Sequence, residues 1–480
     1  MTDVSENELR PEIHPHRPLA ELLLLALPTV AQMASYTVLQ FTDTWMLSKV
    51  GVLEPTAAGN SGMFSFSVVA FGVGVLFVVN TLVSQAFGRR DFGHCGRYLW
   101  QGVWFGVLFS LLLLPTLPLA HLVFRWSGHE PLLVGMEASY YRITVAAAVL
   151  KLTATAFGQF LLAVNRPGCV LVAAVIGVGT NVFANWVLIF GHLGFPALGV
   201  VGAAWGTNLA VLIEMGVLIA FSMMPQIRIR YNALDWRPRR REMGKLMFVG
   251  LPSGGQLVAD VLAWTLFGMW VIGVFGTATM AANTFMFRYM VVSFMPAFGI
   301  ATAVTALVGR YIGMGRPDVA VKRANLGFLV TATYMLACGV FFYVGRNSLI
   351  GVFTDDPEII ELGALFLVFA AVYQFFDAMY IVYNGALRGA GDTLIPAIAT
   401  AALCWGITVF GGYVIAVYRT EWGPAGPWTI ATIYGVILGV FMYARFRRGG
   451  WRRIHLERDE VPATLPGFEL VARPQLSTDK

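Results

Sequence analysis

The chain is dominated by long apolar stretches that are separated by short polar segments. Twelve of these stretches run for roughly 20 to 30 residues, which is enough for a helix to cross a hydrocarbon layer of about 30 Å. They cover approximately residues 20–47, 57–86, 97–126, 136–163, 168–190, 199–224, 246–275, 279–309, 322–349, 359–387, 394–418 and 427–446. The pattern predicts an all-α integral membrane protein with twelve transmembrane helices.

The second half of the chain repeats landmarks of the first half at an offset of about 224 to 226 residues. The repeated pairs include Leu27-Pro28 with Leu251-Pro252, Gly88 with Gly313, and Gly199 with Gly423. With six spans in each half, both halves enter the membrane from the same side, so the repeat is parallel. We therefore expect two six-helix bundles related by an axis along the membrane normal, a design common among transporters.

Basic residues divide unevenly between the two sets of connections. Arg89, Arg166, Arg316 and Arg388 fall in one set together with the run at 228–245, while the other set carries few. The positive-inside rule then places both termini in the cytoplasm. The expected organisation is a cytoplasmic segment 1–19, an amino-terminal lobe 20–224, a cytoplasmic linker 225–245, a carboxy-terminal lobe 246–446 and a cytoplasmic tail 447–480.

Composition narrows the function classes. Hydrophobic residues make up 57% of the chain and charged residues 12%. Together with a mean hydropathy of +0.68, this composition indicates that most of the chain lies within a lipid bilayer. The net charge of +6 reflects short basic clusters beside apolar spans, so we expect no nucleic-acid partner. No phosphate-binding loop, metal-ligand spacing or hydrolase motif occurs, which favours a transporter without a cofactor, driven by an ion gradient, over an enzyme.

Among the ionisable residues within the apolar spans, six are candidates for a functional role, namely Asp43, Lys151, Glu214, Asp260, Arg288 and Asp377. Such residues are costly in lipid and are functional candidates by default. Asp260 and Asp377 fall at a similar depth, and neutral oxygen donors lie nearby at Gln256, Asn283, Gln374 and Asn384. This set is suited to bind Na⁺ as a metal ligand set or to share a proton, and the alternative is purely structural hydrogen bonding.

The first half offers a second candidate acid, Asp43, near the outer end of the first span. Asn181 and Asn185, one helical turn apart, and Thr207 supply polar partners, so Asp43 is a candidate coupling or gating acid, or alternatively a capping acid. Lys151 stands where the second half has Asp377. We hypothesise that it pairs with Asp43 or shapes the cavity potential; backbone carbonyls are the alternative partner. Glu214 has no partner in the sequence pattern.

Aromatic and methionine side chains near these residues could hold planar cations by stacking and cation–π attraction. The candidates for a substrate cavity are Tyr36, Met33, Met286, Tyr289 and Tyr373, with Lys151 and the four amides beside the acids. Packing against lipid or a neighbouring helix is the alternative for each of them.

Five motifs in order resemble the multidrug and toxic compound extrusion (MATE) family, in its NorM-type bacterial branch. They are Leu27-Pro28 with Thr42-Asp43-Thr44-Trp45-Met46, the segment 83–88, the segment 194–204, Gly250-Leu251-Pro252, and Leu387-Arg388-Gly389-Ala390-Gly391-Asp392-Thr393. The resemblance implies a two-lobed monomeric antiporter in the bacterial inner membrane. Such a protein exports cationic, often aromatic drugs in exchange for Na⁺ or H⁺.

Residue by residue, the resemblance assigns cation coupling to Asp260 and Asp377, and a first-lobe proton site to Asp43, Asn181 and Thr207. Asp260 stands where relatives often have glutamate, and Asn185 where some have aspartate. The sequence therefore leaves Na⁺ and H⁺ open as coupling ions. A lipid-linked oligosaccharide flippase of the same superfamily is the alternative function, although it would favour a more cationic cavity.

Overall fold

The computed structural model describes residues 17–126, 128–454 and 456, which form helices joined by short connections. Eleven helical runs are long and apolar enough to cross a membrane, and α5 with α6, which meet at a bend of 46°, make a twelfth. The predicted all-α membrane fold with twelve spans is thus confirmed. The segments 1–19 and 447–480 lie mostly outside the described residues, as do both chain ends.

The first half of the chain forms the helices of one lobe. These are α1 (Pro18–Ser48), α2 (Leu53–Gly88), α3 (Phe92–Leu113), η1 (Leu114–Thr116), α4 (Ala120–Trp126), α5 (Pro131–Ala146), α6 (Ala148–Ala163), α7 (Pro167–Phe190) and α8 (Val200–Ser222). The predicted third span, 97–126, is interrupted after Leu113. Pro115 and Pro118 lie in the break, where their missing N–H groups prevent a continuous helix.

The short helix α9 (Pro225–Arg230) leads into the second half. That half contains α10 (Arg240–Leu266), η2 (Phe267–Val271), η3 (Ile272–Phe275), α11 (Thr277–Gly313), α12 (Pro317–Gly351), α13 (Pro357–Ala390), α14 (Leu394–Leu403), η4 (Cys404–Gly411), α15 (Gly412–Tyr418), η5 (Thr420–Trp422), α16 (Ala425–Arg448) and η6 (Gly450–Arg453). The segments η2 and η4 are π-helical. The equivalent helices of the first half, α1 and α7, are α-helical throughout.

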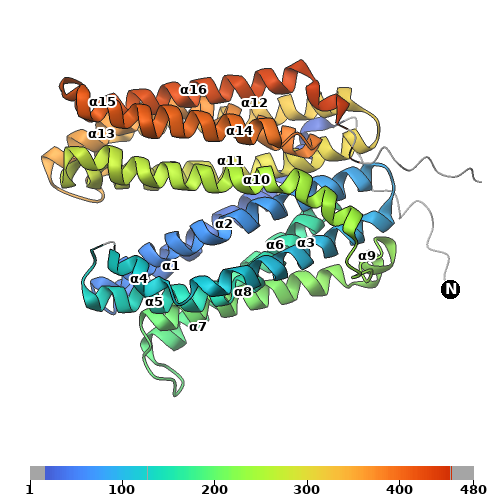
Figure 1. The fold of residues 1–480 in the computed structure, drawn as a ribbon, viewed down its shortest axis with the longest axis horizontal. Helices are drawn as coiled ribbons and strands as arrows, with labels where there is room; N and C mark the ends of the chain where they lie inside the picture. Colours follow the sequence, from blue (N-terminus) through green and yellow to red (C-terminus); the bar gives the residue numbers. More distant parts are fainter. Residues whose placement is uncertain (1–16, 127, 455, 457–480) are drawn as a thin grey trace, which may run out of the picture.

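Figure 1 shows the two halves as two lobes lying side by side, with α3 to α8 in one and α10 to α16 in the other. The lobes converge toward the end of the molecule that holds α9, which we call the linker end, and their ribbons diverge toward the end that holds α4. At the linker end, the backbone at Tyr231 and Ala233 accepts hydrogen bonds from Gly96 and Trp100 of α3. The linker is therefore bound to the first lobe.

Close backbone contacts join the lobes at the linker end. A side chain on Gly88 of α2 would overlap the carbonyl oxygen of Arg310 on α11, and one on Gly313 would overlap the carbonyl oxygen of Gln85. Glycine permits this approach because it has no Cβ. Thr81 donates a hydrogen bond to the Arg388 carbonyl at 2.9 Å, across the same interface.

Helix α1 contacts both lobes. Near its start, Glu21 accepts hydrogen bonds from Arg323 Nε of α12 at 2.7 Å and from the Tyr311 hydroxyl of α11 at 2.8 Å. The side chains of Glu21 and Arg323 are each 5% exposed, so this is a buried ion pair. Farther along α1, Thr29 donates to the carbonyl of Gly299 at 2.9 Å. The second half of α1 instead carries Asp43, which is bonded to α7 of the first lobe.

Candidate functional site: two buried carboxylate networks

Asp260 on α10 and Asp377 on α13 lie in the interior of the second lobe and act on each other electrostatically. Tyr380, nearly one turn after Asp377, donates its hydroxyl to Asp260 Oδ2 at 2.7 Å. The other oxygen, Asp260 Oδ1, is buried and has no hydrogen-bond partner in the part of the chain that the structure describes, and Asp377 is only 6% exposed. The structure thus brings the two predicted carboxylates into one neighbourhood and leaves oxygen atoms available to a ligand.

Gln256 of α10 joins this neighbourhood to two other helices, α13 and α14. It lies one turn before Asp260 on α10, and its Nε2 is 2.9 Å from Thr400 Oγ1 of α14 and 3.3 Å from Asn384 Oδ1 of α13. The same nitrogen is 3.4 Å from the Tyr380 hydroxyl. Gln256 and Asn384 therefore lie beside the carboxylates, as predicted. The side-chain amide of Gln256 holds them together, because its nitrogen lies within hydrogen-bond distance of Asn384, Thr400 and Tyr380.

The other predicted second-lobe residues have partners elsewhere in that lobe. Asn283 accepts from Trp428 at 3.2 Å, Gln374 donates to Ser293 at 2.6 Å, and Tyr289 donates to the Leu349 carbonyl at 2.7 Å. Met286 is fully buried in an apolar cluster, and the Tyr373 ring meets Trp264 edge-on. All five residues thus make contacts within the lobe, and a role in binding substrate stays a prediction for each of them.

In the first lobe, Asp43 is surrounded by the predicted amides. Asn185 of α7 donates from Nδ2 to Asp43 Oδ1 and also lies 3.2 Å from Asn181 Oδ1. Both asparagines are fully buried. Three polar atoms of this region, Asn181 Nδ2, Asn185 Oδ1 and Thr207 Oγ1, are buried and make no hydrogen bond of standard geometry with the described residues. Leaving such an atom unpaired costs about 1–3 kcal/mol, so the region is suited to a water molecule, a proton or an ion.

A second group of first-lobe residues centres on Tyr36. Its hydroxyl donates to Glu214 Oε1 of α8 at 2.6 Å and accepts from Gln32 at 3.3 Å. The ammonium group of Lys151 on α6 lies 4.7 Å from the centre of the Tyr36 ring. Among the described residues, no ion pair joins Lys151 to Asp43, which corrects the first form of our hypothesis. The Lys151 ammonium group instead faces the Tyr36 ring. Met33 lies on the same helix, part-buried.

Sequence patterns missed several partners in these networks. The bond from Tyr380 to Asp260 was not predicted, although Asp377, Tyr380 and Asn384 follow at intervals of three and four and so share one helix face. Thr400 and the Tyr36–Glu214 bond had no such signal, because their partners are 144 and 178 residues away in the chain. Among the described residues, no group of three or more His, Cys, Asp or Glu side chains could hold a metal ion.

Two similar bundles of membrane-spanning helices, with buried acids inside each, define the class of protein: a secondary transporter rather than an enzyme. The MatE family profile matches residues 28–187 and 257–414, which is more than half of the chain. The chain therefore belongs to the MatE family, the multidrug and toxic compound extrusion transporters.

Relatives and solved structures agree with this assignment. The chain is 29% identical over 404 residues to a probable multidrug resistance protein NorM of Mesorhizobium japonicum, covering 82% of this chain and 86% of the relative. It is 27% identical to the multidrug resistance protein PmpM of Pseudomonas aeruginosa, covering 93% and 95%. The eukaryotic MATE transporter AtDTX14 superposes with a TM-score of 0.82 at 17% identity, covering 91% of this chain and 97% of that one. An outward-facing multidrug resistance MATE transporter gives 0.82 at 20% identity, covering 93% and 100%.

Proposed function

We propose that the protein is a multidrug efflux antiporter, which exports cationic, aromatic organic compounds in exchange for Na⁺ or H⁺. The observation that carries the proposal is that three carboxylates inside the membrane-spanning bundles, those of Asp43, Asp260 and Asp377, lack a basic partner among the residues that the structure describes. In the described part of the chain, none of these membrane-embedded carboxylates has a basic group within ion-pair distance. An unpaired carboxylate in a low-dielectric interior is costly, so a cation is its natural ligand.

We further propose that the linker end faces the cytoplasm of a bacterial cell, with the protein a monomer in the inner membrane. The clustering of Arg89, Arg166, Arg228 and Arg316 in connections at this end supports that orientation. With this orientation, lobes that converge at the linker end correspond to an outward-facing state. Exchange of ion and drug then requires the linker end to open in the alternate state.

Ion and drug compete for negative charge in this mechanism. A cation entering from outside binds at Asp260 and Asp377, or a proton binds Asp43, and the affinity of the cavity for a drug cation falls. A ligand shifts a two-state equilibrium only by its differential affinity for the states, so the ion and the drug must favour opposite conformations or exclude each other. The contact of Lys151 with Tyr36 supports a cavity in which aromatic faces receive cations.

The test is efflux of a fluorescent drug cation from proteoliposomes under an imposed Na⁺ or proton gradient. Wild type is compared with Asp260→Asn, Asp377→Asn and Asp43→Asn, and with the control Asp356→Asn. Asp356 is an exposed residue that caps α13, and asparagine caps helices equally well.

Loss of gradient-driven efflux in the Asp260 and Asp377 variants assigns coupling to the second lobe, and loss in Asp43→Asn alone assigns it to the first. The gradient that drives wild-type efflux identifies the ion. Absence of wild-type efflux under either gradient contradicts the proposal and makes lipid-linked oligosaccharide flipping the leading function.

A further inference from the structure

The linker between the lobes carries an excess of positive charge. Residues 225–245 include seven basic and two acidic side chains. Both acids are already paired within the protein. Asp235 lies 2.9 Å from Arg239 and 3.3 Å from Arg97, and the carboxylate of Glu242 lies 4.0 Å from the same Arg97 guanidinium group. The remaining basic residues therefore present positive charge to the surroundings of the linker.

Two arginines of this segment are open to a ligand. Arg237 and Arg240, three residues apart, are both exposed. Their side chains make no hydrogen bond or ion pair with any residue that the structure describes. A guanidinium group has five donors and no acceptor, so an anionic group satisfies it best.

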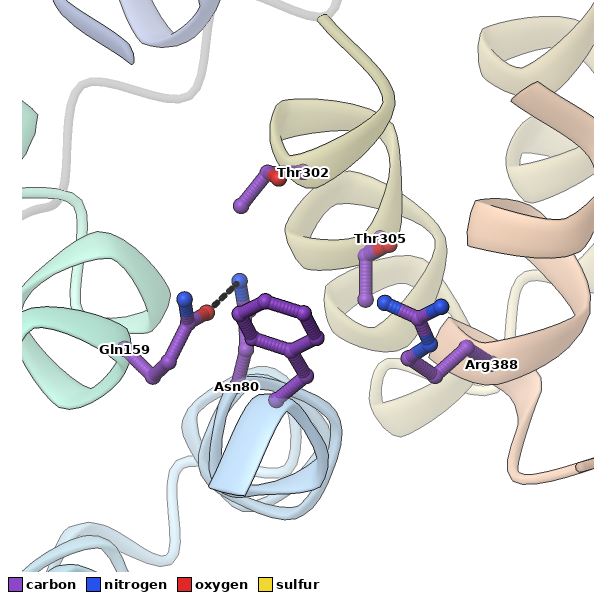
Figure 2. A pocket seen from close by; sticks show the side chains of 6 residues that line it. Asn80, Gln159, Thr302, Thr305 and Arg388 are labelled. Atoms are coloured by element: carbon purple, nitrogen blue, oxygen red, sulfur yellow. Dashed lines mark hydrogen bonds between the residues drawn. The ribbon is translucent and has the colours of Figure 1, made fainter. Parts of the chain in front are cut away.

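Other arginines near the linker end are directed into the protein. Arg323 is 5% exposed and pairs with Glu21. Arg388 lines a small pocket between the lobes, where it faces Asn80 and Gln159 (Figure 2). The charges of these two arginines are thus directed toward the interior of the molecule, unlike those of the exposed linker arginines.

Apolar side chains beside the linker arginines are also exposed. Leu234 is 55% exposed, Trp236 58% and Phe248 of α10 70%. Phe248 follows the exposed Arg241 by seven residues, so both share one face of α10, with about 10 Å of helix between their Cα atoms. Tryptophan is enriched at the level of lipid headgroups, where basic side chains attract anionic lipids. Positive charge above an apolar strip matches a phospholipid better than a free anion.

Side chains of α3 fix the backbone of this segment. Gln101 donates a hydrogen bond to the Arg237 carbonyl at 3.1 Å and accepts one from the Arg239 N–H at 3.0 Å. The indole N–H of Trp104 donates to the Trp236 carbonyl at 2.7 Å. The exposed side chains are therefore presented from a fixed backbone, and replacing the Arg237 side chain leaves these bonds in place.

We propose that Arg237, Arg240 and Arg241 bind the headgroup of an anionic phospholipid whose acyl chain lies along Phe248. The inference goes beyond the proposed transport function and shares with it only the orientation of the linker end, which places the lipid in the cytoplasmic leaflet. Guanidinium groups bind phosphate oxygens through paired, charge-assisted hydrogen bonds. Phosphatidylglycerol meets these requirements, whereas the choline group of phosphatidylcholine adds a positive charge that the arginines repel.

Native mass spectrometry of the full-length protein, stripped of lipid in detergent, tests the proposal without a transport assay. The probes are palmitoyl-oleoyl phosphatidylglycerol and the phosphatidylcholine with the same acyl chains. Wild type is expected to bind phosphatidylglycerol in preference to phosphatidylcholine. Arg237→Gln/Arg240→Gln is expected to bind phosphatidylglycerol about tenfold more weakly, with phosphatidylcholine binding unchanged.

A double variant near the end of α16 controls for the loss of charge alone. Arg447 and Arg452 are exposed at the same end of the molecule. Their guanidinium groups already have aromatic partners, because Arg447 donates to the Tyr443 hydroxyl at 3.0 Å and Arg452 lies 5.4 Å from the centre of the Trp451 ring. Arg447→Gln/Arg452→Gln should leave phosphatidylglycerol binding near the wild-type level. An equal fall in both double variants would reveal general attraction to positive charge and overturn a defined site.

Two further measurements separate a lipid from a free anion and locate the site. Glycerol phosphate has no acyl chain and should not displace phosphatidylglycerol at an equal concentration. Phosphatidylglycerol with a photoreactive diazirine in its acyl chain, in proteoliposomes, should label the peptide that contains Phe248, and less so in Arg237→Gln/Arg240→Gln. Displacement by glycerol phosphate, or labelling that the double variant does not change, would each overturn the proposal.

Elution as a single monodisperse species in detergent confirms the fold of each variant. Wild type that binds the two lipids equally overturns the lipid site and leaves the efflux function standing, because binding is measured without a gradient. Absence of gradient-driven efflux, with selective phosphatidylglycerol binding intact, contradicts the efflux function and supports the lipid site.

Discussion

Gly88 and Gly313 occupy equivalent positions in the two halves of the chain and lie against each other at the linker end. A methyl group on Gly88 would come within 3.1 Å of Gly313 Cα. When equivalent residues of a repeat meet, the axis that relates the halves passes close to their contact, as in an isologous dimer. The duplicated lobes therefore close on each other through a self-complementary glycine pair.

Replacing either glycine by alanine should prevent this closure. We expect Gly88→Ala to favour separation of the lobes at the linker end, because the methyl group overlaps the Arg310 carbonyl. The measurement is maleimide labelling of a cysteine placed at Gln85, in a variant that lacks the four native cysteines, with faster labelling expected. Gly93→Ala is the control, since its methyl group would meet no atom within 4 Å. Identical labelling in the two variants would refute close packing here.

Removing one member of the Glu21–Arg323 ion pair should destabilise the protein more than removing both members. Glu21→Gln leaves a buried arginine without its counter-ion, and we expect the free energy of unfolding in detergent to fall by about 3–5 kcal/mol. The double variant Glu21→Leu/Arg323→Met removes both charges and should recover much of that loss. A double variant as unstable as the sum of the two single variants would contradict this account.

Tyr36 and Asp260 are also equivalents in the repeat, as are Lys151 and Asp377. In the first lobe the two positions form a cation–π contact, whereas in the second they are a pair of carboxylates. Glu214 brings a carboxyl group to the first-lobe group from a different helix. Tyr36→Phe and Glu214→Gln should therefore be non-additive in unfolding free energy, with a coupling of about 1.5–3 kcal/mol, measured by a double-mutant cycle. Strict additivity would show that the hydroxyl does not act on Glu214.

Asp91, in the connection between α2 and α3, should give stability that depends on pH. Its hydrogen bond with His94 lowers the pKa of the carboxyl below its ordinary value of 3.8. The folded state thus favours the ionised form, so the stabilisation is complete above the ordinary pKa and is lost as the pH falls through the lower folded-state pKa.

The matching experiment compares thermal unfolding of wild type and Asp91→Asn at neutral and strongly acidic pH. Wild type should be the more stable at neutral pH, and the difference should vanish in acid. A difference that persists in acid would indicate that the carboxylate charge is not its source. The effect should be small, because the Asp91 side chain is 36% exposed.

The sequence predicted the spans, the repeat and the neighbourhoods of Asp43 and of Asp260 with Asp377, because periodic apolar runs and charges in lipid are strong signals. Internal breaks were harder to predict. The bend between α5 and α6 and the π-helical turns η2 and η4 depend on packing between helices, and apolar sequence continues through them. Side-chain partners such as Tyr36 with Glu214 required the three-dimensional fold, because nothing in the local pattern of either helix points to the other.

Several of the hydrogen bonds that join the lobes at the linker end are individually weak. Thr81 with Arg388, Gln85 with Gly389 and Arg310 with Asn165 contribute about 0.5–1.5 kcal/mol each. One elementary charge crossing a membrane potential of 100 mV releases about 2.3 kcal/mol. For the ion-coupled mechanism proposed above, the energy from one charge crossing the membrane is thus of the same size as each of these bonds. In that mechanism, bonds of this strength can break and form again in each transport cycle at the expense of the ion gradient.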